Sequence, residues 1–487
     1  MNLQAPFRPS AVSAGEVKSL PGPKRAPVVG NLLQLDLPRL HLQLEDWAAT
    51  FGSLYRLKLL NREVLVVSDP TLIAAILRDR PTTWRRPANF EPIFREARAH
   101  GLFSAEGDDW RRQRRMVMTA FDPAHLRRFM PHLVRVTERL RDRWSRAAEA
   151  GVEMDLQAEL MCFSVDAASG LSFGVDINTI EDERSELHEH LAAVFPILMR
   201  RINMPFPYWR YVRLPIDRAF DRHKAQIHRA IEGLVSEARD RVAQRTQDGG
   251  SPSDLLEAML LGRDGDGSAL SAEEVAGNVY TMLVASQDTT ANSLAWTIYL
   301  LRTHPPAWYR LVEEARRNLA QESVPRDLEQ ARALTFAEAC AKEAMRLRPV
   351  APVLFLDAVQ DTQVGHVKVT KGTTVFCLMR SAAVDEANVR DAGEFQPERW
   401  LSDDKSMEAS SPKRVSMPFG AGPRLCPGRY LAMLEMNLVL GMLARNFELL
   451  EVAGPGGAVP EEVLTFTMHP VGLRMRLKAP FVSPRPA

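Results

Sequence analysis

The stretch Ser416–Tyr430, SMPFGAGPRLCPGRY, places a cysteine in an unusual setting. Cys426 lies among glycines at 420, 422 and 428, with prolines and an arginine beside it. A buried structural cysteine needs no such surroundings, because it packs as a small apolar residue. Glycines let the backbone approach a bulky neighbour and adopt conformations that other residues avoid. The pattern therefore indicates a sulfur that meets something large and flat.

The other three cysteines, Cys162, Cys340 and Cys377, lie far apart in the sequence and form no C-x-x-C pair. We therefore expect neither a disulfide framework nor a structural zinc site. None of the three has a setting like that of Cys426, so we interpret them as inert buried thiols. Scattered single cysteines fit a reducing, cytoplasmic location.

The composition is that of an ordinary folded protein. Hydrophobic residues make up 45% of the 487 residues, and 62 basic residues balance 61 acidic ones. This balance gives no reason to expect nucleic acid as a partner, because phosphate binding needs concentrated positive charge. No apolar run reaches the roughly eighteen residues of a spanning helix, and the first residues contain no signal-peptide core. We expect a soluble protein.

The cysteine stretch fits the pattern F-x-x-G-x-R-x-C-x-G, through Phe419, Gly422, Arg424, Cys426 and Gly428. In this pattern the chain resembles the cytochrome P450 family of haem-thiolate monooxygenases. Four more motifs of that family occur in its order: Trp110 and Arg114 (W-x-x-x-R), Ala285–Thr290 ([AG]-G-x-[DE]-T-T with one departure), Glu343 and Arg346 (E-x-x-R), and Pro397–Trp400 (P-E-R-[WF]). The motifs span most of the chain.

The resemblance implies a haem b cofactor, with the Cys426 thiolate as the metal ligand. A thiolate ligand donates charge to haem iron and favours O–O cleavage. Trp110, Arg114 and Arg424 are expected at the haem propionates, where an arginine can bind a carboxylate through two hydrogen bonds. Phe419 is expected to pack beside the sulfur.

Two departures alter these expectations. Pro427 follows the cysteine and has no N–H, so we expect the sulfur to accept one hydrogen bond fewer than in relatives. Many relatives place a further propionate arginine where this chain has Leu356. We therefore expect its propionates to rest on fewer cations.

One long helix is expected near the middle of the chain. Ser271 and Glu274 form a capping box, S-x-x-E, and His304-Pro305-Pro306 ends the helical pattern after Thr303. At 1.5 Å per residue this helix would be roughly 50 Å long. Its centre reads ASQDTT, which by itself fits a solvated turn or a satisfied core pair.

The resemblance gives that centre a catalytic role. Thr289 would contact the oxygen molecule and Asp288 would help to bring protons from solvent, an acid and an alcohol suited to proton delivery. Ala285 lies one helical turn before Thr289 and is small enough to leave room for oxygen and substrate. Ser286 stands where the family usually has glycine, which leaves the details of proton supply open.

Glu343 and Arg346 are three residues apart and can pair on one helix face. By resemblance, Arg399 of the P-E-R-W motif completes a buried charge network with them. We expect a structural role, because removal of one member would leave buried charge uncompensated.

We predict a mainly α fold with a minor β part, the cytochrome P450 fold, with a long central helix over a buried haem. Residues 1–19 are expected to form a tail without a membrane anchor, and 20–487 a single domain. A non-helical lead-in covers 20–30, a hairpin turns at Asn61-Arg62, and short strands lie within 364–379. Polar breaks are expected at 247–253 and 264–267.

The leading hypothesis is a monooxygenase that inserts one atom of O2 into a hydrophobic substrate, such as a fatty acid or terpenoid. The expected pocket walls are apolar and aromatic: Phe90, Phe94, Leu102, Phe103, Val353, Leu354, Phe355 and Phe466. The same residues could be ordinary core. Alternatives are desaturation or oxidative coupling, or a haem sensor without turnover, although a sensor would not need Asp288 and Thr289.

The chain after Cys426 is too short for a fused reductase domain, so electrons are expected from a separate ferredoxin or flavodoxin. Arg111, Arg112 and Arg115 could receive an acidic partner of this kind. A solvated basic face explains these three arginines equally well. The segment around 195–215 mixes aromatic residues with arginines and fits either a membrane contact or a substrate lid.

Overall fold

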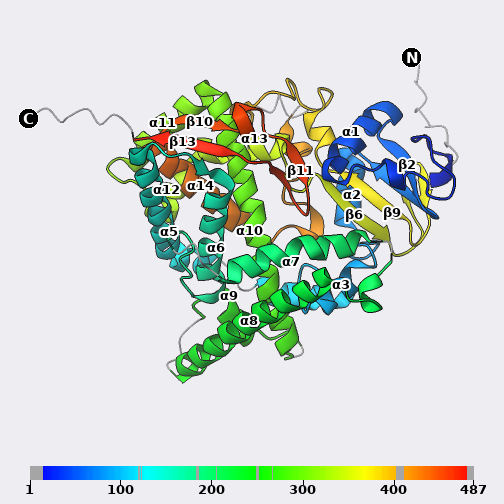
Figure 1. Ribbon diagram of the computed structural model, residues 1–487, viewed down its shortest axis with the longest axis horizontal. Helices are drawn as coiled ribbons and strands as arrows, with labels where there is room; N and C mark the ends of the chain where they lie inside the picture. The colour runs from blue at the N-terminus through cyan, green and yellow to red at the C-terminus, as the bar shows by residue number, and fades with distance from the viewer. Residues whose placement is uncertain are drawn as a thin grey trace, which may run out of the picture.

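The computed structural model describes residues 15–118, 121, 123–181, 186–204, 206–247, 252–265, 267–401 and 411–479. The protein is mainly helical with smaller sheets, as predicted (Figure 1). The helices are α1 (Leu40–Phe51), α2 (Pro70–Arg78), α3 (Phe90–Glu96), α4 (Gly107–Met118), α5 (Pro123–Ala150), α6 (Leu156–Phe173), α7 (Glu186–Asn203), α8 (Pro215–Gln247), α9 (Leu255–Leu261), α10 (Ala272–Thr303), α11 (Pro305–Leu319), α12 (Leu328–Ala333), α13 (Thr335–Leu347) and α14 (Arg429–Asn446). The strands are β1 (Gly15–Glu16), β2 (Leu54–Leu59), β3 (Arg62–Val67), β4 (Trp84–Arg85), β5 (Met154–Asp155), β6 (Val353–Ala358), β7 (Thr362–Val364), β8 (Val367–Val369), β9 (Thr374–Leu378), β10 (Glu448–Ala453), β11 (Glu462–Leu464), β12 (Met468–Pro470) and β13 (Arg474–Lys478).

The predicted central helix is confirmed as α10, which runs through the middle of the molecule (Figure 1). The Ser271 side chain accepts from the backbone N–H of Glu274, and the Glu274 carboxylate accepts from the N–H of Ser271. The helix ends at Thr303, where Pro305 begins α11. The ASQDTT centre is helical throughout, so it is not a turn.

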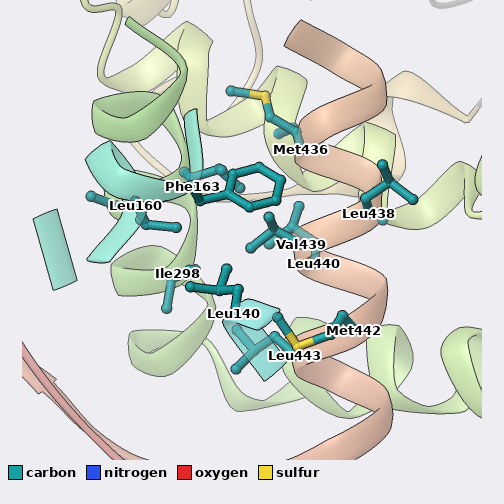
Figure 2. Packing of buried hydrophobic residues seen from close by; sticks show 14 of the residues in the cluster. Leu140, Leu160, Phe163, Ile298, Met436, Leu438, Val439, Leu440, Met442 and Leu443 are labelled. Atoms are coloured by element: carbon teal, nitrogen blue, oxygen red, sulfur yellow. The ribbon is translucent and has the colours of Figure 1, made fainter. Parts of the chain in front are cut away.

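The main hydrophobic core lies where α5, α6, α10 and α14 meet. α14 is buried on nearly all sides from Leu434 to Ala444, as expected for a helix that is apolar all round. Figure 2 shows side chains of this core that converge from the four helices: Leu140, Leu160, Phe163, Ile298, Met436, Leu438, Val439, Leu440, Met442 and Leu443. This packing fixes α14, and with it the cysteine loop that precedes it.

A five-stranded sheet at the other side of the molecule has the order β2-β3-β9-β6-β4. β3 and β9 run parallel, and the other neighbours are antiparallel. The predicted hairpin is confirmed, because β2 and β3 pair from Leu54↔Val67 to Leu59↔Arg62. The short strands expected within 364–379 are β8 and β9.

The N-terminal residues that the structure describes belong to the fold. Gly15 and Glu16 form β1, which pairs with β8, and Val17 is buried in the core beside the large sheet. Residues 15–19 are therefore packed, although we expected a tail there. Residues 1–14 lie outside the described part. The polar break at 247–253 lies partly outside it, and 262–271 connects α9 to α10.

The expected charge network around Glu343 is confirmed. The Arg346 guanidinium donates two hydrogen bonds to the Glu343 carboxylate, at 2.9 and 2.8 Å, and both side chains are fully buried. Arg399 and Trp400 donate to the same carboxylate at 3.1 and 2.8 Å. Arg346 also donates to the carbonyl groups of Ala383 and Ala392. The network ties α13 to the P-E-R-W segment.

Replacing Glu343 by alanine should lower the free energy of unfolding by roughly 3–5 kcal/mol, because two arginines lose their shared buried carboxylate. Urea denaturation followed by circular dichroism measures the change, and failure to accumulate folded protein points the same way. The matched control is Glu338→Ala on the same helix, whose pair with Lys342 is partly exposed and should contribute less than about 1 kcal/mol. Equal losses in both variants would contradict this role of the network.

Candidate active site

The loop that carries Cys426 is shaped by glycines and by its contact with α2. Gly420 and Gly422 have φ angles of 74° and 67°, in the left-handed region that favours glycine. A Cβ at Gly422 would lie 2.5 Å from the carbonyl oxygen of Leu77. The backbone N–H of Cys426 donates to the carbonyl of Phe419 at 3.0 Å, which closes the loop. These contacts hold the sulfur just before α14 begins.

The environment of the Cys426 sulfur is suited to a metal ligand. Burial raises the pKa of the thiol, while N–H groups of Gly428 and Arg429 and the charge of Arg114 lower it. The missing N–H of Pro427 thus leaves two backbone donors near the sulfur. Because burial opposes the free thiolate, a cation at the sulfur would stabilise the anionic form.

The other expected cofactor residues gather around this loop. Arg114 on α4 donates to the carbonyl of Leu425 at 2.8 Å. The Arg424 guanidinium lies over the Trp110 ring, 4.5 Å from its centroid. Phe419 packs against the main core. The structure therefore brings Trp110 and Arg114 of α4 to the cysteine loop, which itself carries Phe419 and Arg424.

Two further arginines, Arg80 and Arg86, lie near Arg424 and were not identified from the sequence. Arg424 forms an ion pair with Glu106 at 2.6 Å, and Arg86 lies 3.7 Å from the same carboxylate. Arg80 is close enough to both arginines to affect their pKa values. Burial and the neighbouring cations Arg80 and Arg114 lower the pKa of Arg424 to about 9, against the opposing charge of Glu106. Two guanidinium groups thus share one carboxylate, and the third, that of Arg80, lies near enough to feel its charge.

This arginine cluster fits a haem with two propionates. When all four groups are ionised, Arg80, Arg86, Arg424 and Glu106 together have a net charge of +2. Buried nitrogens of all three arginines have no hydrogen-bond acceptor in the described part of the chain. Buried donors are almost always paired, so these nitrogens are suited to receive carboxylates that the protein itself does not supply.

The expectation that Leu356 leaves the propionates with fewer cations stays a prediction. Leu356 is buried in the apolar core beside the large sheet. Arg80 and Arg86, on either side of β4, place cations at the site from another direction. The signal in the sequence was the unusual density of arginine in RPTTWRRP, the segment 80–87.

On α10, Ala285 and Thr289 lie on one face as expected. The Thr289 hydroxyl donates to the carbonyl of Ala285 at 2.8 Å, and Ala285 is exposed in the structure. Burial raises the pKa of Asp288, while the charge of His469 on β12 acts in the opposite direction. Ser286 donates to the carbonyls of Met282 and Leu283, so its hydroxyl is used within the helix.

A buried acid behind this face was also missed. Glu435 on α14 is hydrogen-bonded to Thr290, and burial raises the pKa of Glu435 to about 8. Glu435 is therefore largely protonated at neutral pH. The pair links the helix that follows the cysteine to the helix that carries Thr289.

Four of the expected pocket residues form one aromatic cluster. The ring centroids of Phe90 and Phe94 are 4.8 Å apart, and Phe103 lies 5.7 Å from each. Phe466, between β11 and β12, lies 5.6 Å from Phe103. The strand residues Val353 and Phe355 instead pack into the apolar core beside α1, so ordinary core packing explains them.

The three arginines expected to meet a redox partner are paired within the protein. Arg111 pairs with Asp108, Arg112 with Glu274, and Arg115 with Asp264 at 2.7 Å. Their charge is locally balanced, so they do not form an uncompensated basic face.

The comparisons with known proteins agree on one family. The sequence profile described as Cytochrome P450 matches residues 20–475. The mitochondrial 1,25-dihydroxyvitamin D(3) 24-hydroxylase of Rattus norvegicus is 26% identical over 481 residues, which cover 93% of this chain and 89% of the relative. The crystal structure of the cytochrome P450DA heme domain has a TM-score of 0.83 at 24% identity, covering 95% of this chain and 98% of that one.

A second curated relative has a different organisation. The bifunctional cytochrome P450/NADPH–P450 reductase of Gibberella moniliformis is 26% identical over 491 residues. The match covers 98% of this chain, which spans 42% of that relative's length. The chain belongs to the cytochrome P450 family and has its fold. As a member it is an oxidoreductase of the haem monooxygenase class.

Within the described residues, no helix has both the length and the apolar character needed to cross a bilayer.

Replacing Arg80 by leucine should speed haem loss roughly tenfold or more, because a buried charge-assisted hydrogen bond to a propionate disappears. Transfer of haem to apomyoglobin measures the rate. Arg78→Leu is the matched control, since its exposed side chain lies two residues away. Haem loss from Arg80→Leu at the wild-type rate would refute the assignment of the arginine cluster to the propionates.

Proposed function

We propose that the protein is a haem b monooxygenase that inserts one atom of O2 into a hydrophobic small molecule. The observation that carries this proposal is the position of Cys426, held by a glycine loop at the start of α14 beside the arginine cluster. When bound, the haem supplies oxygen activation, which a thiolate ligand promotes. Cys426 serves as the ligand, and Trp110, Arg114, Arg424, Arg80 and Arg86 hold the propionate side.

Thr289 and Asp288 supply the proton-handling groups in this proposal. The hydroxyl of Thr289 lies on the same face of α10 as the small side chain of Ala285 and can hold a proton at that face. Asp288 has a raised pKa because of burial, so it exchanges protons more readily near neutral pH than an exposed aspartate does. Phe419 shields the sulfur side from water by packing on the core.

The proposed substrate class is supported by the aromatic cluster of Phe90, Phe94, Phe103 and Phe466. Such a lining favours an apolar ligand, for which we propose a fatty acid or a terpenoid. A library of both classes, screened for the spin-state change of the haem spectrum, tests the proposal. Binding by polar compounds alone would argue against it.

We propose that electrons come from a separate ferredoxin or flavodoxin. Exposed basic groups on this side of the protein include Arg78 and Arg414, which line one hollow of about 230 Å³, and Arg429 is partly exposed at the start of α14. An acidic partner would be attracted to these groups. The cytoplasmic location proposed with it fits the four cysteines, which are all free thiols.

The reduced, CO-treated protein should show the red-shifted Soret band that reports thiolate ligation. Cys426→Ser should abolish this band, because a serine oxygen is a much weaker charge donor. Cys162→Ser is the matched control, since this thiol lies on α6 and should leave the spectrum unchanged. An unaltered band in Cys426→Ser would contradict the proposed function.

Thr289→Ala should uncouple electron consumption from product formation, because the hydroxyl that handles protons at oxygen is removed. The measurement is the amount of hydrogen peroxide released per pair of electrons consumed, with a bound ligand that changes the spin state of the haem. This ratio is expected to rise several-fold. Ser293→Ala is the matched control, since Ser293 makes the same bond to the carbonyl four residues earlier, one turn along α10. Unchanged coupling in Thr289→Ala would show that another group acts at the oxygen.

A further inference from the structure

A hollow of about 370 Å³ lies between the end of α3 and the outer face of α8. It is separate from the cysteine loop and from the face of α10 that carries Thr289. Figure 1 shows α3 and α8 in the lower part of the molecule. The hollow, named here the α3–α8 hollow, is lined by Arg98, Lys224, Ala225, His228, Arg229 and Glu232.

The walls of the α3–α8 hollow are anchored by contacts between the two helices. The Lys224 ammonium donates to the carbonyl of Glu96 at 3.3 Å, and Nε2 of His228 lies 3.2 Å from the carbonyl of Ala97. These carbonyls lie at the C-terminus of α3, where they accept no hydrogen bond from the backbone of the helix. His228 is 8% exposed, so the floor of the hollow is built from a buried polar side chain.

The charge of the hollow is positive and not balanced by its surroundings. Within the part of the chain that the structure describes, the side chains of Arg98 and Arg229 have no hydrogen bond or ion pair, and Glu232 is the one carboxylate in the lining. Lys224 lies 3.4 Å from Asp221, which also pairs with Arg213. Burial lowers the pKa of His228, and the charges of Arg98 and Lys224 lower it further.

The neighbouring charges on α3 are already used elsewhere. Arg95 pairs with Glu91 at 2.9 Å. The Glu96 carboxylate accepts from Trp209 and Arg210. No acid of α3 is therefore directed to Arg98.

The backbone at Arg98 forms the C-terminal cap of α3 and fixes where the Arg98 side chain begins. Arg98 has a φ of 53°, and the N–H of Ala99 donates to the carbonyl of Phe94 at 2.8 Å, which closes the end of α3. This position after a helix favours glycine, because other residues are strained there. The strain here places a guanidinium at the rim of the hollow.

We propose that the α3–α8 hollow binds a small phosphorylated molecule. The forked guanidinium groups of Arg98 and Arg229 match the oxygens of a phosphate, and Lys224 adds a third donor. The hollow is larger than a phosphate ion and leaves room for a small organic group. Bound phosphate would hold the end of α3 against α8, close to the aromatic cluster that contains Phe94.

Titration calorimetry of the haem-loaded protein with inorganic pyrophosphate, at constant ionic strength, tests the proposal. We expect saturable binding and a rise in melting temperature. Arg98→Gly and Arg229→Ala should each weaken binding at least about tenfold. Without ligand, Arg98→Gly should melt at the wild-type temperature or above it, because glycine relieves the backbone strain.

The matched control is Arg95→Ala, which removes the same charge one turn away and should bind like the wild type. Equal weakening in this control would reveal non-specific charge attraction and overturn the site. Absence of saturable binding, wild-type affinity in Arg98→Gly, or equal affinity for citrate would also overturn it. Glycerol 3-phosphate and vesicles with and without phosphatidic acid then distinguish a free phosphate ester from a lipid headgroup, either of which supports the phosphate site.

Discussion

The structure depends on a cluster of buried positive charge that the protein alone does not neutralise. Arg86 and Arg424 share the Glu106 carboxylate, Arg80 lies near enough to feel its charge, and several nitrogens of the three arginines have no acceptor within the described residues. Burying an unpaired charge is costly, so such a cluster is stable in the company of an anion. A haem with two propionates supplies that anion in the proposed holoprotein. The fold and the cofactor are therefore coupled through charge.

The sulfur is subject to the opposite constraint. Burial disfavours the Cys426 thiolate, and the nearby N–H groups and Arg114 offset this effect in part. In the proposed holoprotein, a metal cation would complete the balance at the sulfur, as the propionates would at the arginines. Both ends of the site are thus arranged for one large group that is cationic at its centre and anionic at its edge. The buried network of Glu343, Arg346 and Arg399 is different, because its charges are satisfied by the protein itself.

The α3–α8 hollow lies outside this arrangement, yet the same reasoning applies to it. Its arginines are exposed to solvent and so cost little when they are unpaired. What marks the hollow is the combination of unpaired cations with a strained backbone at Arg98. α3 also carries Phe90 and Phe94, so occupancy of the hollow would act on the same helix that contributes to the aromatic cluster.

The sequence by itself determined the family through its motifs, and it determined the central helix, the hairpin and the Glu343–Arg346 pair through the spacing of neighbouring residues. A capping box, a turn and an i,i+3 ion pair need only local spacing. The tertiary structure decided which charges are compensated. It paired Arg112 and Arg115 with acids from other segments, and it brought Arg80 and Arg86 to Arg424. Burial and long-range pairing depend on which segments meet, and local spacing carries no information about that.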